Sequence, residues 1–275
     1  MYYHIRHGQR SDHMAKCPAD WDQIKNTSDP HLTEEGKRMG LESGKYFKSL
    51  MNTPEFTNKK ICIMTSPYYR CLQTTEKIIE GLGIENVYNK TIYVEYAYEE
   101  WWSNIANVGE SARIKRVFNN LTPEYEKELF SQVTAYETNH FFADKDFWSS
   151  MTYPETYSSM IERNIKAIDH VAWLALQPEH QDKVFLVVSH GSYGFALEPM
   201  LNQTITMPNY CGIACLKVKA NERVASLDSK SACQKYIDTW SFRGDHYEWQ
   251  LNVKCDWEAV FTNYYAYNDS KSAQV

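Results

Sequence analysis

The sequence lacks several features that would place it outside the ordinary globular proteins. No stretch of its 275 residues approaches the roughly 20 consecutive apolar residues that a membrane span needs. The seven cysteines are odd in number and have no C-x-x-C spacing, so they do not form the pattern of a disulfide framework. No repeat, low-complexity tract or secretory signal precedes or interrupts the first expected elements. We therefore expect a cytoplasmic globular protein without a membrane span.

A surplus of basic residues is also missing. The chain has 29 lysines and arginines against 35 acidic residues, a net charge of -6. Binding to nucleic acid usually needs the opposite balance, so we expect no nucleic-acid partner. A small anionic ligand remains possible, because a local arginine cluster can lie within an acidic protein. The length and the 43% hydrophobic content suit one large α/β domain, which we expect to span residues 1–275.

The order of apolar runs predicts alternating strands and helices. Strands are expected at 2–5, 61–65, 91–95, 183–189 and 213–218, with a looser edge strand near 247–253. Helices are expected at 34–50, 66–80, 154–176 and 191–201, with Thr33 and Ser66 as N-caps. This alternation is typical of a mostly parallel sheet covered on both faces. We expect a three-layer α/β sandwich.

One stretch departs from this alternation. Residues 101–153 are rich in aromatic and polar residues and show no clear parallel-strand signal. We interpret them as a mostly helical insertion over the active site. Aromatic residues from Tyr98 to Trp148 could line a pocket for an aromatic substrate, although such a density of aromatics is more often part of a core.

The N-terminal strand leads into Arg6-His7-Gly8-Gln9-Arg10. A neutral imidazole is a good nucleophile toward phosphorus, and arginines on both sides would bind phosphoryl oxygens. Gly8 would let the backbone approach a ligand closely. A lone histidine in a turn is usually structural, but its arginine neighbours favour a catalytic His7.

Two further candidates follow other expected strands. Arg70 lies one turn past Ser66-Pro67, where a helix N-terminus would also favour an anion, although an exposed helix arginine is an equal alternative on spacing alone. His190 follows the most apolar strand. Since the carboxyl ends of strands carry the reactive groups in such folds, His7, Ser66 and His190 are expected to meet there.

A carboxylate pair, Glu99-Glu100, precedes Trp101. Cleavage of a phosphate ester needs an acid that protonates the leaving oxygen. Burial beside the tryptophans would raise the pKa of such a carboxyl toward neutrality. An exposed acidic pair is the plainer alternative for these two residues considered alone.

Together these segments resemble the histidine phosphatase superfamily, also called phosphoglycerate-mutase-like. The resemblance is carried by Arg6-His7-Gly8, Leu32-Thr33-x-x-Gly36, Ser66-Pro67-x-x-Arg70-x-x-Gln73-Thr74 and Ser189-His190-Gly191. Within it, Arg10 and Asp12, the Glu100-Trp101 pair and Glu155 with Arg163 are most similar to the suppressor-of-T-cell-receptor-signalling and ecdysteroid-phosphate phosphatases. Gln9 stands where that branch has glutamate.

The resemblance implies a role for each matching residue. His7 would be the phosphorylated nucleophile, and Glu100 the proton donor with Glu99 as its rival. The remaining implied residues bind the phosphoryl group: Arg6, Arg10, Arg70 and His190. The family uses no metal or other cofactor, and four cationic or polar donors with one acid can suffice for phosphoryl transfer.

We therefore expect a phosphomonoester hydrolase that acts through a phosphohistidine. A phosphoglycerate mutase and a non-catalytic phosphate-binding protein are the alternatives. The expected partner is a phosphorylated substrate, either a small molecule or a phosphotyrosine protein, and a homodimer is the common oligomeric form of such enzymes.

Overall fold

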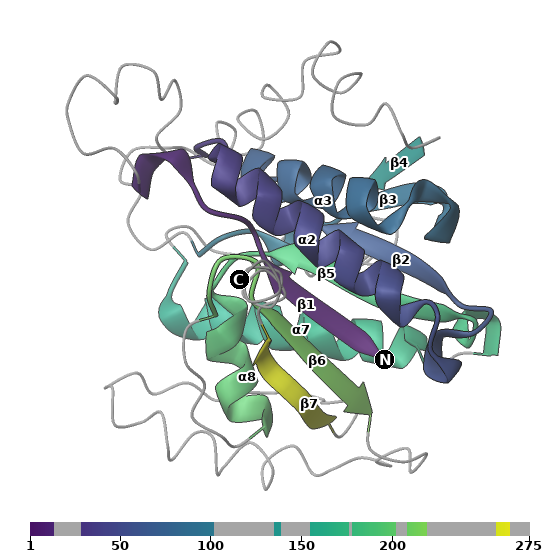
Figure 1. The fold of residues 1–275 in the computed structure, drawn as a ribbon. Coiled ribbons are helices and arrows are strands. Elements are labelled where there is room, and N and C mark those ends of the chain that lie inside the picture. The colour runs from purple at the N-terminus through teal and green to yellow at the C-terminus, as the bar shows by residue number, and fades with distance from the viewer. Residues whose placement is uncertain are drawn as a thin grey trace, which may run out of the picture.

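The computed structural model describes residues 1–13, 29–101, 135–138, 155–175, 178–201, 208–218 and 257–264 (Figure 1). The strands are β1 (Tyr2–Arg6), β2 (Lys60–Thr65), β3 (Val87–Val94), β4 (Ala135–Thr138), β5 (Lys183–Ser189), β6 (Ile213–Val218) and β7 (Trp257–Tyr264). The helices are α2 (Glu34–Leu50), α3 (Tyr69–Leu82), α7 (Tyr157–Ala175) and α8 (Tyr193–Leu201). Short 3-10 turns include η1 (Ser11–His13) and η4 (Tyr96–Tyr98).

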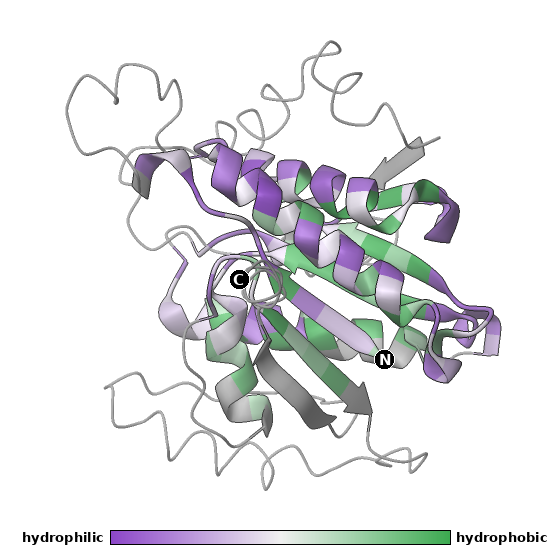
Figure 2. Cartoon of the chain, in the orientation of Figure 1, coloured by the Kyte–Doolittle hydropathy of each residue, from purple (hydrophilic) through white to green (hydrophobic). Residues whose placement is uncertain are grey.

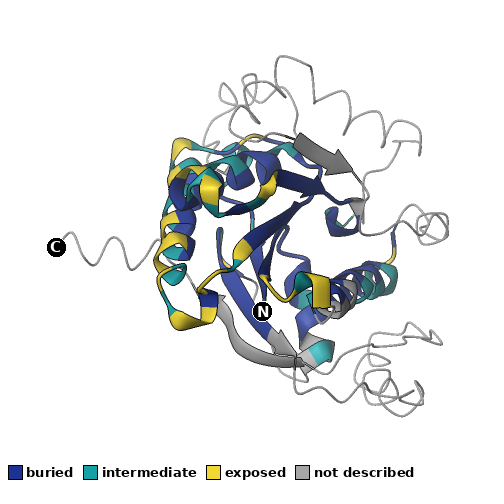
Figure 3. Ribbon diagram, turned by 90° about the vertical axis from the view of Figure 1, so that its right-hand side faces the viewer, coloured by how far each residue is buried: buried dark blue, intermediate teal, exposed yellow. Residues whose placement is uncertain are grey.

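The described strands form one mixed sheet in the order β4-β3-β2-β5-β1-β6-β7. The five strands from β4 to β1 run parallel, whereas β6 and β7 are antiparallel to their neighbours. The central strands β2, β5 and β1 are almost entirely buried, as Figure 3 shows. Continuous burial on both faces is what a parallel sheet requires, because helices cover both of its sides.

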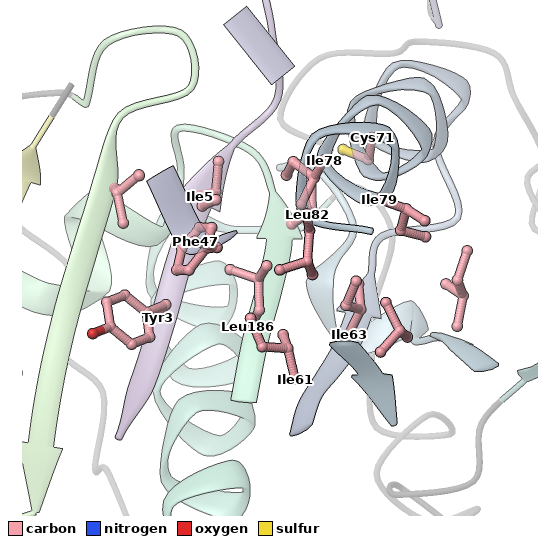
Figure 4. Close-up of a cluster of buried hydrophobic side chains, with 14 of the residues drawn as sticks. Tyr3, Ile5, Phe47, Ile61, Ile63, Cys71, Ile78, Ile79, Leu82 and Leu186 are labelled. Carbon is pink, nitrogen blue, oxygen red and sulfur yellow. The ribbon is translucent and has the colours of Figure 1, made fainter. Parts of the chain in front are cut away.

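One face of the sheet packs against α2 and α3. Apolar side chains that alternate along the strands fill this interface, as Figure 4 shows for Ile5, Ile63 and Leu186 beneath Phe47 and Leu82. The two helices approach each other closely at Gly44 and Gly81. A Cβ at Gly81 would lie 2.3 Å from the carbonyl oxygen of Leu41, so only glycine allows this packing.

The other face packs against α7 and α8. The intervening strand positions point here, including Met64, Phe185 and Val187, and they meet Ile165 and Ile168 of α7. With α2 and α3 on the opposite side, the described chain has three layers. The expected α/β sandwich with a mostly parallel sheet is confirmed.

Helix α2 illustrates how local sequence specifies an element. Its N-cap is Thr33, whose hydroxyl accepts the N–H of Gly36 at 2.9 Å, as the sequence predicts. Its charged residues are at least partly exposed while Met39 and Phe47 are buried, which gives the helix the mixed colouring of Figure 2. The observed bounds coincide with the predicted 34–50.

Three sequence predictions need comment. Helix α3 begins at Tyr69, not at Pro67, and its N-cap is Tyr68 without a side-chain cap, so the predicted Ser66 cap is wrong. Strand β4 lies within 101–153, where no strand was predicted, and pairs parallel with β3. The other residues of 102–153, and the predicted edge strand at 247–253, lie outside the described residues. The observed edge strand is β7.

Candidate active site

The carboxyl ends of three adjacent parallel strands bring the predicted residues together. His7 follows β1, Ser66 follows β2 and His190 follows β5, which lies between them. The sheet ladder continues into this region, because the N–H groups of His7 and Ser66 donate to the carbonyls of Ser189 (2.8 Å) and Val188 (2.9 Å). The ring centroids of His7 and His190 are 5.4 Å apart.

His7 is held in the protonation state that a nucleophile needs. Its Nδ1 lies 2.8 Å from the carbonyl oxygen of Gly8, which can only accept, so Nδ1 carries the proton. Burial lowers the pKa of His7 well below its ordinary value, and the charges of Arg70 and Arg6 act in the same direction. Nε2 therefore keeps its lone pair.

The loop after His7 is fixed by glycines and by α3. A Cβ at Gly8 would lie 2.5 Å from the carbonyl oxygen of Gly36, and a Cβ at Gly36 would lie 2.4 Å from that of Gln9. The Gly8 N–H donates to the Thr74 hydroxyl at 2.9 Å. The side-chain carbonyl of Gln73 accepts the Leu32 N–H at 2.8 Å. The motif residues thus dock the loop onto α2 and α3.

Gln9 is turned toward the start of α2. Its side-chain carbonyl accepts from the Thr33 hydroxyl at 2.9 Å. The Thr33 hydroxyl in turn accepts the Gly36 N–H, so Gln9 supports the helix cap. The phosphatase branch that this sequence resembles has glutamate at this position, whereas here the side-chain amide of Gln9 supports the start of α2.

Arg70 is the best connected side chain of the site, and it is only 1% exposed. Its Nη1 donates to Asp29 at 3.0 Å, and its Nη2 lies 3.2 Å from Glu100 and 3.0 Å from His190 Nδ1. Asp29 also accepts the Tyr69 N–H at 2.8 Å, where α3 begins. Asp29 is not among the site residues predicted from the sequence, although its carboxylate orients Arg70.

His190 lies between Arg70 and Ser66. Its Nδ1 accepts from Arg70, and its Nε2 is 2.9 Å from the Ser66 hydroxyl. Burial lowers the pKa of His190 to about 4, so the ring is neutral at pH 7. An Nδ1 that accepts requires the proton on Nε2, which then donates to Ser66. The Ser66 hydroxyl also accepts the Tyr68 N–H at 3.5 Å, but α3 begins only at Tyr69, so Ser66 does not cap the helix as the sequence predicts.

Glu100 points into the site. Its Oε2 is 3.3 Å from His190 Nδ1 and 3.2 Å from Arg70 Nη2, and 30% of its side chain is exposed. Burial acts to raise the pKa of Glu100, but the pKa is held well below its ordinary value, and the fixed positive charge of the adjacent Arg70 is a cause that acts in this direction. The expectation of a raised pKa is therefore wrong for the unliganded site, because the neighbouring charge dominates over desolvation.

A buried ion pair supports the segment that carries Glu100. Arg163 of α7 binds both oxygens of Glu155 at 2.8 Å. Its Nη1 also donates to the carbonyls of Ala97 (2.8 Å) and Glu99 (2.9 Å). The backbone of this segment is thereby held against α7, which fixes the direction of the Glu100 side chain.

Arg6 directly precedes His7 in the chain. Its Nη1 donates to the Pro208 carbonyl at 2.8 Å, and its guanidinium carbon is 4.3 Å from the centre of the Tyr210 ring. The Nε of Arg6 and the Nε of Arg70 are buried and have no hydrogen-bond partner among the described residues. An oxyanion bound at this site would satisfy unpaired cationic donors of this kind.

Arg10 is placed differently from the other arginines. Its guanidinium binds Asp12 through two nitrogens, with Nε at 2.9 Å from Oδ1. Burial lowers the pKa of Arg6, and the charge of Arg10 acts in the same direction, so Arg10 contributes to the positive potential there. The structure thus brings Arg6, Arg70, His190 and His7 together, with Arg10 beside them and already paired.

Residues 2–111 match the family model of the histidine phosphatase superfamily, branch 1. The matched range includes the nucleophile loop, both helices on its side of the sheet and Glu100, while His190 follows later in the chain. This match supports phosphoryl-transfer activity.

The chain is also similar to individual proteins, in sequence or in fold. The chain is 33% identical over 100 residues to the transcription factor tau 55 kDa subunit of Saccharomyces cerevisiae, a match that covers 36% of this chain and only a fifth (20%) of that protein. In fold it is similar to the ecdysone phosphate phosphatase of Bombix mori (TM-score 0.52, 14% identity, 78% of this chain and 88% of that one). It is also similar to mycobacterial hydrolase 1 (TM-score 0.51, 12% identity, 96% and 98%).

One group of side chains in the described region has the composition of a metal site. His7, Glu100 and His190 each offer a ligand atom, and these atoms lie within 4.8 Å of one another. The buried guanidinium of Arg70 is already bound to two of the three. A cation would have to displace this fixed positive charge, so the group fits an anion better than a metal ion.

None of the described helices combines the length and the apolar character that crossing a bilayer requires.

Proposed function

We propose that the protein is a phosphomonoester hydrolase that acts through a phosphohistidine on His7. The observation that carries this proposal is the state of that side chain. A neutral imidazole presents its Nε2 lone pair beside two arginines that each retain an unsatisfied buried N–H. This combination suits attack on a dianionic phosphate group.

In the proposed first step, His7 Nε2 attacks phosphorus. The N–P bond forms as the ester P–O bond breaks, and the leaving oxygen takes a proton from Glu100. In the second step, water attacks the phosphohistidine and gives its proton to Glu100 while the N–P bond breaks. Inorganic phosphate leaves, and His7 and Glu100 return to their starting states.

Glu100 needs a proton in the first step, although its pKa is low in the unliganded site. The charges around the site explain how a bound substrate would bring Glu100 into its protonated state. Three arginines (Arg6, Arg10 and Arg70) are matched by three carboxylates (Asp12, Asp29 and Glu100). A bound dianion would therefore leave a negative excess and would compete for Arg70. Both effects raise the pKa of Glu100, so proton uptake would accompany substrate binding.

The phosphoryl oxygens would be bound by Arg6, Arg70 and His190, with Arg10 strengthening the local potential. Arg6 and Arg70 offer their unpaired Nε–H groups. Phosphoryl transfer depends mainly on position and charge, so this set can act without a metal ion. A strong chelator should then leave the activity unchanged.

The nucleophile is tested by replacing His7 with alanine. The variant should lose turnover of p-nitrophenyl phosphate and the acid-labile phosphoenzyme that rapid quenching traps in the wild-type protein. His31→Ala, an exposed histidine near the same loop, is the matched control. Near-normal turnover in His7→Ala would contradict the mechanism.

The proton donor is tested with leaving groups of different basicity. Glu100→Ala should slow alkyl phosphates far more than p-nitrophenyl phosphate, because only poor leaving groups need protonation. Glu99→Ala is the control for the rival carboxylate. Glu99 is 2% exposed, and its backbone carbonyl accepts from Arg163. Equal losses on both substrates for Glu100→Ala would assign the acid elsewhere.

The described site recognises the phosphoryl group, and a small molecule or a phosphotyrosine protein can present it. Tyr98 does not line a substrate pocket, since it is fully buried in the core. Assays of 2- and 3-phosphoglycerate interconversion separate a hydrolase from a mutase on the same fold. A cytoplasmic homodimer remains part of the proposal, and sedimentation of the purified protein tests the dimer.

A second candidate is a non-catalytic phosphate-binding protein. The observation that favours it is the likeness of 100 residues to a transcription factor subunit, whose name describes no hydrolytic activity. Phosphate binding without turnover of any aryl phosphate would support this candidate over the hydrolase.

A further inference from the structure

A histidine that the proposed chemistry does not use lies inside the sheet, just before the nucleophile loop. His4 is fully buried in β1, on the face that packs against α7 and α8. Burial lowers its pKa well below the ordinary value, so the ring is neutral. An imidazole at such a position is costly unless both of its nitrogens are paired.

Both nitrogens of His4 are paired. Nδ1 is hydrogen-bonded to the Tyr2 hydroxyl, and Nε2 to the Ser189 hydroxyl. Burial raises the pKa of Tyr2, so its phenol keeps its proton and donates to Nδ1. A neutral imidazole has a single N–H, which must then be on Nε2 and donate to Ser189.

Ser189 is the residue that joins the two histidines of the site. Its carbonyl accepts the backbone N–H of His7 at 2.8 Å, and the next residue in the chain is His190. It also pairs with Arg6 in the ladder between β1 and β5. A side chain that holds Ser189 in position therefore also holds His7 and His190, whose ring centroids are 5.4 Å apart.

Besides Tyr2 on its own strand, aromatic rings from two other segments contact the His4 ring. Tyr193, three residues after His190, stacks on it at 3.8 Å with an interplanar angle of 21°. Tyr98, two residues before Glu100, meets it edge-on at 5.9 Å. The ring thus contacts the segments that carry His190 and Glu100, and it lies on the same strand that leads to His7.

We propose that His4 is a positioning residue, which through Ser189 fixes the spacing between His7 and His190. This inference rests on the proposed function, because the spacing matters for in-line transfer between a nucleophile and a phosphate-binding imidazole. A shift of about 1 Å in such a site can lower the rate by up to about a hundredfold.

The test uses His4→Leu, His4→Gln, Ser189→Ala and the double variant His4→Leu/Ser189→Ala. The control is Tyr3→Phe, which removes a hydroxyl from the adjacent residue on the opposite face of β1, where Tyr3 packs on Phe47. For each protein, kcat and KM for p-nitrophenyl phosphate are measured together with the Tm.

His4→Leu and Ser189→Ala should each lower kcat by about tenfold to a hundredfold, with KM within about twofold of the wild type. The double variant should be no slower than the worse single variant, because both changes remove the same hydrogen bond. His4→Gln retains a side-chain N–H and should recover part of kcat. Tyr3→Phe should keep the wild-type kcat.

The inference would be overturned if the double variant lowered kcat by the product of the two single factors. It would also be overturned if Ser189→Ala left kcat unchanged. Both outcomes leave the proposed function intact. If His4→Leu does not fold, the kcat values of Ser189→Ala and His4→Gln are compared with those of the wild type and Tyr3→Phe instead. If the wild type itself has no turnover, the proposed function fails. The positioning role is then read from the ring ¹⁵N shifts of His7 and His190, which Ser189→Ala should move and Tyr3→Phe should not; unchanged shifts would refute it.

Discussion

Acidification should destabilise this protein at a pH where most carboxylates are still ionised, because three histidines are buried and neutral at and beneath the site. Burial lowers the pKa of His190 to about 4, and it also lowers the pKa values of His4 and His7. In the unfolded chain each of these side chains titrates near its ordinary pKa of about 6.5. The folded and unfolded states therefore bind different numbers of protons in mildly acidic solution.

The sign follows from this difference. Between about pH 6.5 and 4, the unfolded chain binds a proton at His190 that the folded chain does not, so the free energy of unfolding falls as the pH falls. From pH 7 to pH 5, His190 alone should cost about 2 kcal/mol, and about 3 kcal/mol once the pH is below 4. His4 and His7 add losses of the same sign. Against a typical total of about 5–15 kcal/mol, this is a large share.

The carboxylates of the site act mostly outside this window. Glu100 has a lowered pKa, so its stabilising effect is complete above its ordinary value of about 4.5 and is lost only as the pH falls further, through the lowered one. Burial raises the pKa of Asp29, so its contribution has the opposite sign and relieves some instability as the pH falls. Neither effect removes the slope between pH 7 and 5.

Urea unfolding in buffers without oxyanions measures the effect, since phosphate would bind the folded site. The free energy of unfolding is compared at pH 7, 6 and 5 for the wild type, His190→Asn and His31→Asn. His190→Asn should show a shallower pH dependence, whereas His31→Asn, an exposed histidine, should keep the wild-type slope. A change of less than about 0.5 kcal/mol between pH 7 and 5 in the wild type would refute the reasoning.

Three substitutions test other parts of the site. Asp29→Asn should lower the free energy of unfolding by about 1–3 kcal/mol in urea titrations and raise the KM for p-nitrophenyl phosphate, because Arg70 loses a buried charged acceptor. Gly36→Ala should cost about 1–3 kcal/mol by the same assay, because the new methyl meets backbone atoms of the nucleophile loop that cannot move aside. Arg163→Met should cost about 3–5 kcal/mol by leaving Glu155 buried and unpaired, and thermal melts of Arg163→Met with Glu155→Gln should recover part of that loss.

The sequence predicted the features of the fold that depend on local pattern. Helix α2 begins after Thr33 because that hydroxyl caps the helix within three residues, which is information contained in the segment itself. The start of α3 was predicted wrongly for the opposite reason. The Ser66 hydroxyl is hydrogen-bonded to His190, which lies 124 positions away in the chain, and no local pattern reveals that contact.

The same distinction applies to the site. The strand ends predicted that His7 and His190 would meet, and the parallel pairing of β1 with β5 explains why they do. The partner of Arg70 was missed, since Asp29 lies 41 positions before it and follows no apolar strand. The pKa of Glu100 was predicted in the wrong direction because its cationic neighbours come from other elements of the fold.

Much of the sequence motif serves the scaffold and not the reaction. Gly8, Gly36, Gln73 and Thr74 dock the nucleophile loop onto two helices, and none of them needs to contact a substrate. A protein that had lost its activity but kept its fold would retain all four. The case for catalysis therefore depends on the free Nε2 of His7 and on the carboxyl of Glu100, which a scaffold alone would not require. Measurements on these two side chains distinguish an enzyme from a binding protein more sharply than any motif match.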